Sequence, residues 1–441
     1  MRRHQSYAAV PSKDDRQKHI DRLLRELDKL LQEEYKDSGD PGTLDDIEEV
    51  SDRIAEGVRR IVSDKLLRKK ERDAQQSQAP RECTCHCGAQ ARYKECRTRQ
   101  FVLRSGQHSL TRAYYHCAAC HHGFCPLDTA LVLPDGQYSP RVATLMVRLN
   151  MLFPDRQAAC EMHELLGLDP AVSTIQRYSR CVGKRIADEW HKQEEDWRKG
   201  RLPESQKRPK RLVLTMDAFK LHVGGDWRDA KIAAAYELSV KGRAVNTQFT
   251  ATLETSTEFG KRLPVLAHRA GADHCQDIEV VADGGNWIWQ ETGKYFPTSV
   301  QVLDYPHGSG HLWEAARARY GDGTKACKDW ADELKDLMYN EKHAELLGDI
   351  RAWRPRNEDK RKTRRCLFNY LVEHKDRMAY KTLEDKGYHI GSGVIEASCK
   401  NVGQIRMKRA GQRWEEPGAE AMLHLCSYAS SAGTAGFRQY V

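Results

Sequence analysis

The chain has 441 residues, which is more than one ordinary hydrophobic core holds, so we expect two or more domains. Lys and Arg total 72 against 63 Asp and Glu, and the net charge of +9 favours a polyanionic partner. No run of about 18 apolar residues occurs, and the start lacks the apolar core of a secretory signal, so we expect a cytosolic protein without a membrane partner. Fourteen cysteines in that compartment argue against a disulfide framework.

Residues 1–80 are predicted to form a helical N-terminal region. Apolar residues recur at helical spacing on both sides of an interruption at 37–43 (DSGDPGT), which predicts a helical hairpin. Its apolar stripe can pack within the chain or against another subunit, and the pattern leaves both possibilities open.

Residues 81–130 form a short module in which cysteines are crowded, with CTCHCG followed by YYHCAACHHGFCPLD. Two short-spaced pairs of thiolates can close a tetrahedron around one zinc ion, which lets so small a piece fold. The second pair is a clean C-x-x-C, whereas the first is ambiguous because CTCHCG offers Cys83 as a third choice. We select the pair directly before Gly88, since that glycine can supply the turn behind it. The predicted structural zinc ligands are Cys85, Cys87, Cys117 and Cys120.

Residues 137–198 contain three predicted helices, with a short turn around 167–170 before the third. Two amphipathic helices joined by such a turn match the outline of a helix-turn-helix. Ser173 is a candidate N-cap of the third helix. Four side chains of that helix are candidates for contact with DNA bases or phosphates: Thr174, Gln176, Arg177 and Arg180.

From residue 211 the pattern changes to five predicted strands, in the segments RLVLTMDAFKL, AKIAAAYEL, TQFTATLE, DIEVVADGG and TSVQVLDYPHG. In three of them the apolar run ends in an aspartate: RLVLTMD, DIEVVAD and TSVQVLD. A single acid at a strand end is commonly a cap or turn residue. Because Asp217, Asp283 and Asp304 follow three strands that alternate with helical stretches, we expect them to share a site at one edge of a sheet.

A helical, highly charged region at 312–388 precedes the segment GSGVIEASCKNVGQIRMKRAGQRW. Helical spacing predicts that Ser392 caps a helix there and that Ile395, Ser398, Val402 and Ile405 form its packed face. A second stripe of the same helix carries one carboxylate followed by cations, which suits a metal ligand followed by phosphate contacts. The stripe begins at Glu396, and the predicted phosphate contacts are Lys400, Lys408 and Arg409.

On these residues the chain resembles the DDE transposases of bacterial insertion sequences, and most closely their ISKra-type family. The resemblance rests on GSGVIEASCKNVGQIRMKRAGQRWEEPGAEAML, on MDAFK, on ADGGNWIW and on the cysteine module, so it covers most of residues 83–425. The acids are spaced by 66 residues (283 − 217) and 113 residues (396 − 283), which fits a core interrupted before its last acid. The segment DYPH at 304–307 resembles the D-x-x-H element of Mutator-like relatives.

The resemblance implies an α+β multidomain chain with an RNase H-like mixed α/β core (residues 211–311 and 389–430), interrupted by the helical insertion at 312–388. It implies Mg²⁺ or Mn²⁺ held by Asp217, Asp283 and Glu396, with ions that activate water or a DNA 3′-hydroxyl and stabilise the leaving oxygen. Asp217 would bridge the ions, and His307 and His311 would lie beside the site. The implied activity is cleavage and strand transfer of double-stranded DNA, at insertion-sequence ends and at a target, by a prokaryotic homo-oligomer.

Two rival functions keep most of these features. An inactive descendant would retain the zinc and helix-turn-helix modules as a DNA-binding protein, although the intact acids argue against it. A stand-alone metal-dependent nuclease would keep the same three acids, and only terminal inverted repeats flanking the gene would exclude it.

Overall fold

The computed structural model describes residues 17–18, 21–22, 25–29, 31–33, 42–76, 81–133, 136–239 and 241–441. They divide into two compact units, Met1–Val142 and Ala143–Val441, which are treated separately below. Most of the first helix of the predicted N-terminal hairpin lies outside the described residues. Within the described residues, no helix combines the length and apolar character needed to cross a membrane.

The first unit contains a long helix and a small antiparallel sheet. Helix α2 (Leu44–Gln76) packs against strand β3 (Gly106–His116), where buried His108 contacts Asp64 at 2.7 Å. The sheet has the order β1-β2-β3-β4, with β1 at Glu82–Thr84, β2 at Gln90–Leu103 and β4 at Gly123–Phe124. A short helix, α3 (Pro126–Ala130), follows it.

Three helices precede the main sheet, as predicted. They are α4 (Pro140–Leu152), which begins at the boundary between the units, α5 (Asp155–Leu166) and α6 (Val172–Arg198). Gly167 ends α5 in the left-handed conformation, at φ 61°. The predicted cap was wrong, because Ala171 occupies the N-cap of α6 and Ser173 lies inside the helix.

The main sheet is mixed and has the order β7-β6-β5-β8-β9. Its antiparallel part is β5 (Arg211–Val223), β6 (Asp226–Leu238) and β7 (Ala244–Thr252), and its parallel part joins β8 (Asp277–Ala282) and β9 (Val300–Leu303) to β5. All five predicted strands are present. Asp283 and Asp304 follow strand ends as expected, but the prediction for Asp217 was wrong because β5 continues to Val223.

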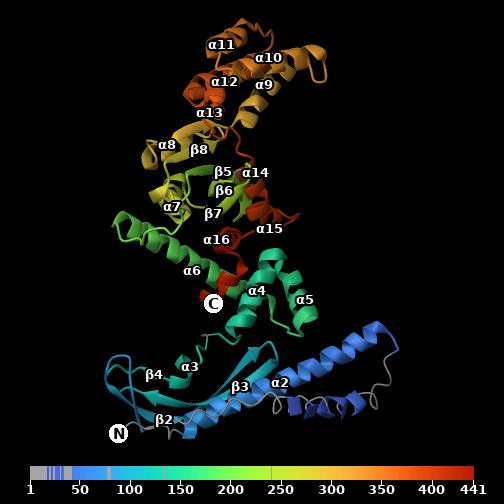
Figure 1. Cartoon of the computed structure of the whole chain (residues 1–441), viewed down its shortest axis with the longest axis vertical. Helices are drawn as coiled ribbons and strands as arrows, with labels where there is room; N and C mark the ends of the chain where they lie inside the picture. Colours follow the sequence, from blue (N-terminus) through green and yellow to red (C-terminus); the bar gives the residue numbers. More distant parts are fainter. Residues whose placement is uncertain are drawn as a thin grey trace. The chain divides into compact units, whose positions relative to one another are not determined.

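Helices cover both sides of this sheet. In Figure 1, α7 (Ser256–Ala270) and α8 (Asn286–Tyr295) lie to one side, and α14 (Gly393–Ser398) and α15 (Ile405–Met407) to the other. The π-helix η3 (Cys399–Gln404) joins α14 to α15, and α16 (Glu416–Ala432) packs against α6 and β7. The short 3₁₀ segments are η1 (Ala272–His274), η2 (Lys375–Arg377) and η4 (Thr434–Gln439).

The predicted helical region forms a separate group at the β9 end of the unit (Figure 1). It comprises α9 (Tyr305–Tyr320), α10 (Lys325–Tyr339), α11 (His343–Ala352), α12 (Glu358–His374) and α13 (Tyr380–Asp385). One continuous hydrophobic core connects these helices with the sheet and with α16. The chain is therefore mixed α and β, with two sheets.

Candidate functional site

The sheet register places Asp217 and Asp283 side by side. The parallel pairing of β5 with β8 ends at Met216 and Ala282, and the next residue along the chain is an aspartate in both cases. Burial raises the pKa of Asp217, and the nearby negative charge of Asp283 raises it further. Asp217 and Asp283 are thus two half-buried carboxylates held close together. A cation bound there would relieve their repulsion.

Helix α14 brings the third acid to the same place through Cys399, its C-cap. The buried thiol of Cys399 donates to Asp217 Oδ2 at 3.2 Å. Burial raises the pKa of this thiol, and the charges of Asp217, Asp283 and Glu396 all contribute to the increase. All three predicted acids therefore lie near enough to Cys399 to influence the pKa of its thiol, and the side chain of Glu396 is exposed.

Asp304 has a structural role beside these acids. Its buried carboxylate accepts the backbone amide of His307 at 2.8 Å, as the N-cap of α9, and that of Ser392 at 2.5 Å. The amide of Tyr305 also donates to the Ile390 carbonyl at 2.9 Å. Asp304 thus holds the loop that leads into α14. Ser392 occupies the N-cap of α14, but its side chain makes no capping bond, contrary to the sequence prediction.

Aromatic and histidine side chains from the helical group surround Asp283. A Cβ on Gly284 would lie 2.2 Å from the Tyr370 ring, so α12 packs directly on the turn that follows Asp283. The ring centroids of His311 and Tyr370 are 4.5 Å apart with the rings tilted, and those of His307 and His311 are 5.0 Å apart. Within the described residues the buried hydroxyl of Tyr370 has no hydrogen-bond partner. Burial raises its pKa, with Asp283 adding to the effect.

The π-helix η3 changes which residues of the segment after Glu396 are buried. A Cβ on Gly403 would lie 2.1 Å from the Phe219 ring, so only glycine fits at this contact with β5. The extra residue of the π-turn rotates the following residues, and Arg406 and Met407 are buried where helical spacing predicted Ile405. Ile405 is exposed, and that prediction was wrong. Lys400 and Lys408 are exposed, but Lys408 lies beyond the helix end.

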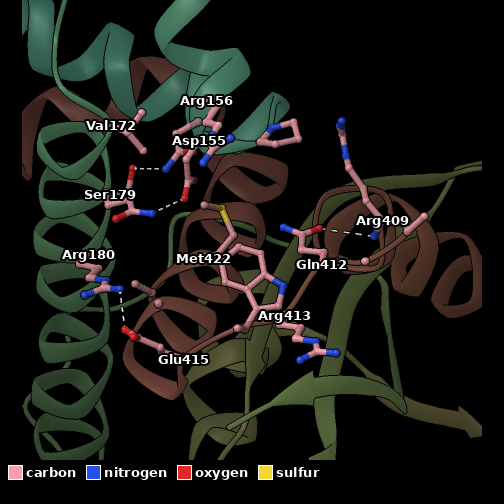
Figure 2. A pocket seen from close by; sticks show the side chains of 18 residues that line it. Asp155, Arg156, Val172, Ser179, Arg180, Arg409, Gln412, Arg413, Glu415 and Met422 are labelled. Atoms are coloured by element: carbon pink, nitrogen blue, oxygen red, sulfur yellow. Dashed lines mark hydrogen bonds and ion pairs between the residues drawn. The ribbon is translucent and has the colours of Figure 1, made fainter. Parts of the chain in front are cut away.

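A basic hollow of about 690 Å³ lies between the three helices and the loop before α16. Arg156 reaches it from α5, Arg180 from α6, and Arg409 and Arg413 from the loop before α16, as Figure 2 shows. It therefore contains Gln176, Arg180 and Arg409, which the sequence placed on two separate DNA surfaces. The structure joins those surfaces at one hollow.

Two of the predicted DNA-contact side chains on α6 have partners within the protein. Gln176 donates to Asp155, and Arg180 donates to Glu415 at 2.9 Å (Figure 2). Thr174 is half-buried and Arg177 is exposed. Arg177 is thus the predicted residue on α6 whose side chain is most accessible, together with the exposed end of Arg180.

Buried Arg406 connects helices α4 and α5 to the segment that carries Glu396. Its guanidinium donates to the Asn150 carbonyl at 2.6 Å and to Asp155 at 3.3 Å. It also lies 5.0 Å from the centre of the Trp414 ring. Because a buried charge without partners is costly, these contacts fix α4 and α5 to the region after η3.

The first unit holds a second candidate metal site. The sulfur atoms of Cys85, Cys87, Cys117 and Cys120 lie within 4.8 Å of one another. Cys85 and Cys120 are 3.6 Å apart and Cys87 and Cys117 are 3.7 Å apart, close to the roughly 3.8 Å expected for tetrahedral Zn–S bonds of about 2.3 Å. Backbone amides, above all that of Cys120, lower the pKa of Cys117 to about 7.

The turn chemistry explains why these four cysteines meet. Gly88 has φ 86° and its amide donates to the Cys85 carbonyl at 2.9 Å, so the glycine turns the chain behind the first pair. Cys83 lies on β1 and is not part of the cluster. These four cysteines could hold one zinc ion, and they are the four that the sequence selected.

Sequence patterns did not mark Cys399, Tyr370, His374, Arg156 or Arg413 as site residues. Cys399 follows Glu396 by three residues, one helical turn, and that spacing was an available signal. For Tyr370 and His374 no local signal exists, because their place beside Asp283 depends on how α12 folds back.

Comparisons with known proteins add one distant relative. No protein-family model matches the chain. It is similar to the UPF0236 protein in vanSb 3'region of Streptococcus gallolyticus, at 24% identity over 312 residues. The match covers 68% of this chain and 66% of the relative, so the chain spans just under two thirds of the relative's length. That description names no activity, and the functional argument rests on the geometry.

Proposed function

We propose that the protein is a DNA transposase of the DDE type that cleaves and joins phosphodiester bonds with Mg²⁺ or Mn²⁺. The observation that carries this proposal is the hydrogen bond from Cys399 to Asp217, beside which Asp283 and Glu396 both raise the pKa of the same thiol. The main sheet, with its order β7-β6-β5-β8-β9, supports an RNase H-like core. The four-cysteine cluster supports a structural zinc ribbon in the first unit.

The donor set of the acid cluster fits a hard divalent cation. Carboxylate oxygens are the ligands that Mg²⁺ and Mn²⁺ prefer, and burial together with the charge of Asp283 raises the pKa of Asp217, so a cation would be favoured there. Such ions would supply activation of water or a DNA 3′-hydroxyl and stabilisation of the leaving oxygen. Asp217, on the central strand of the sheet, is the candidate bridging ligand.

The chain's own residues would hold and orient DNA around these acids. Exposed Lys400 follows Glu396 by one turn and is placed to neutralise a phosphate. The hollow lined by Arg180, Arg409 and Arg413 would accept the backbone of an insertion-sequence end bound by α6. We expect the active form to be a homo-oligomer on DNA in a prokaryotic cytosol, associated with the nucleoid.

The decisive experiment replaces each acid without changing its size. Asp217→Asn, Asp283→Asn and Glu396→Gln should each reduce Mg²⁺-dependent cleavage of insertion-sequence ends to background while DNA binding persists. Asp226→Asn is the matched control, because Asp226 is an exposed acid on the same β5–β6 hairpin. Cleavage at the wild-type rate by any of the three acid variants would remove that acid from the site. Cleavage without joining of the ends to a target would instead favour a stand-alone nuclease.

A binding experiment separates the two DNA surfaces. Removing one phosphate-binding side chain should lower the slope of log affinity against log salt by about 0.9, on any sequence. We expect this for Lys400→Ala, Lys408→Ala and Arg409→Ala. Thr174→Ala and Arg177→Ala should instead weaken binding to the ends by about 1 to 3 kcal/mol more than binding to random DNA. A reversed pattern would show that the two surfaces are assigned the wrong way round.

A further inference from the structure

The basic segment at 351–365 forms a groove that the proposed function does not use. This segment contains eight basic and two acidic residues. It folds as the end of α11 and the first half of α12, and between them lies a groove of about 530 Å³. Its charged lining is Arg351, Arg354, Glu358, Arg361, Arg364 and Arg365.

The arginines of this groove are held in place without being neutralised. The guanidinium of Arg351 lies 4.7 Å from the centre of the Phe368 ring. Arg354 donates to the backbone carbonyl of Arg351, and Arg364 donates to that of Trp353 at 2.9 Å. These interactions orient the side chains and leave their positive charges in place.

Only one carboxylate lines the groove, and it balances little of this charge. Glu358 lies 3.5 Å from Arg361, and both side chains are more than half exposed, at 70% and 54%. Such pairs contribute little, so five cations against one acid leave four positive charges (5 − 1 = 4). Guanidinium groups match phosphate oxygens in geometry, which makes a polyanionic phosphate backbone the complementary ligand.

Helix α12 also fixes where this ligand would lie. The helix continues from the groove to Tyr370, which packs on Gly284 beside Asp283. At 1.5 Å per residue, Arg365 and Arg361 lie about 8 and 14 Å along the helix axis from Tyr370. A duplex that runs along α12, with a rise of about 3.4 Å per base pair, would cover these distances in roughly two to four base pairs.

We propose that the groove between α11 and α12 binds backbone phosphates of the DNA duplex, two to four base pairs from the bond that is cleaved. The position relative to the cleaved bond rests on the proposed function, whereas phosphate binding by the groove does not. The groove binds the duplex without recognising its sequence, because guanidinium contacts to phosphates do not distinguish one base from another.

The test uses the full chain, without divalent metal, and a 30-base-pair duplex of arbitrary sequence. Arg361→Gln/Arg365→Gln removes two groove charges that orient no backbone carbonyl in the described residues. Lys360→Gln/Lys362→Gln removes two charges from the same helix outside the groove lining. The arginine pair should lower the slope of log affinity against log salt by about 1.8, since each phosphate contact contributes about 0.9. The lysine pair should leave the slope unchanged.

The possible results of this test distinguish the groove proposal from the proposed function. Arg361→Lys/Arg365→Lys should keep most of the wild-type slope, and thermal unfolding of each variant shows whether it is folded. Equal slopes in all variants, or equal decreases for the arginine and lysine pairs, would overturn the groove proposal. If the slope changes as expected but the wild-type protein never cleaves DNA, the proposed function is wrong and the groove proposal stands.

The position of the groove has its own test on DNA that the protein cleaves. Neutral methylphosphonates placed two to four base pairs from the cleaved bond should weaken wild-type binding and should not weaken binding by the arginine double variant further. Equal weakening of both proteins would show that the groove contacts DNA elsewhere.

Discussion

Cys399 donates its thiol to Asp217 across the junction between α14 and β5, at 3.2 Å. The cysteine lies on the same helical turn as Glu396, so one hydrogen bond sets the position of two acids. The thiol does this without adding charge, because its burial and the surrounding acids raise its pKa and keep it protonated. Cys399 is therefore a positioning residue for the proposed metal site.

Removal of this thiol should weaken metal binding and thereby slow cleavage. A hydrogen bond to a charged group contributes about 1.5 to 3 kcal/mol, so Cys399→Ala should reduce cleavage at limiting Mg²⁺ by about tenfold or more. Cys399→Ser keeps a donor and should retain most of the activity. The measurement is the cleavage rate as a function of Mg²⁺ concentration. Cys426→Ala, another buried cysteine, is the control, and a Cys399→Ala protein with the wild-type Mg²⁺ dependence would rule out the positioning role.

The four-cysteine cluster should hold one zinc ion per chain. Because structural zinc contributes about 10 to 16 kcal/mol of binding free energy at neutral pH, Cys117→Ala should lose the metal and expose strands β1–β4 to proteolysis. Cys96→Ala, an exposed cysteine of the same module, should keep the zinc. Elemental analysis of purified protein together with limited proteolysis checks both expectations. Wild-type protein without zinc would contradict them.

Glu279 should make stability depend on pH. This carboxyl on β8 is fully buried, and burial raises its pKa from 4.5 to about 7, although the His389 amide and Arg211 oppose the increase. A raised carboxyl pKa means that the contribution to stability is complete below about pH 4.5 and is lost as the pH rises through 7. The loss amounts to about 3 kcal/mol, since one pKa unit corresponds to about 1.4 kcal/mol.

Urea unfolding at pH 5 and pH 8 measures this effect. Wild-type protein should lose more free energy of unfolding between the two pH values than Glu279→Gln, whose amide does not titrate. The difference between the two losses isolates Glu279 from other titrating groups. Parallel losses would show that Glu279 is ionised at the same pH in the folded and unfolded chain.

The π-helix should tolerate no side chain at Gly403. An alanine Cβ would lie 2.1 Å from the Phe219 ring, and overpacking of this kind typically costs about 1 to 3 kcal/mol. Gly403→Ala should therefore lower the unfolding temperature, and Phe219→Leu in the same chain should restore part of the loss. Gly393→Ala is the control, because no atom lies within 4 Å of its Cβ position. If Gly403→Ala is as stable as the wild type, the close approach of η3 to β5 is wrong.

Features that depend on a local pattern of residues, such as strands and cysteine pairs, could be predicted from the sequence. Apolar runs marked all five strands of the main sheet, and the placement of Asp283 and Asp304 after strand ends was confirmed. The same pattern misplaced Asp217, because β5 extends beyond its pairing with β8 as a hairpin with β6, in which Phe219, Leu221 and Val223 are buried in alternation. Glycine and cysteine spacing predicted the four-cysteine cluster.

Features that depend on contacts between residues far apart in the sequence could not be predicted. The π-turn at η3 has no compositional mark, so helical spacing placed Ile405 in the packed face where Arg406 and Met407 are buried. Gln176 was assigned to DNA because its partner, Asp155, is recognisable only once α5 and α6 are packed. The place of Tyr370 beside Gly284 likewise follows from the return of α12 to the sheet.

The hydrogen bonds of Arg406 limit where the chain can be cut to make a fragment. A fragment that begins at β5 would remove Asn150 and Asp155 and leave the Arg406 guanidinium with neither of its acceptors on α4 and α5. It would also remove Gly183, whose Cβ position lies 2.5 Å from the Ala421 carbonyl, and so uncover α16. A fragment that keeps these contacts therefore begins before α4, and α4, α5 and α6 cannot be exchanged for helices of another protein without rebuilding the segment after Glu396.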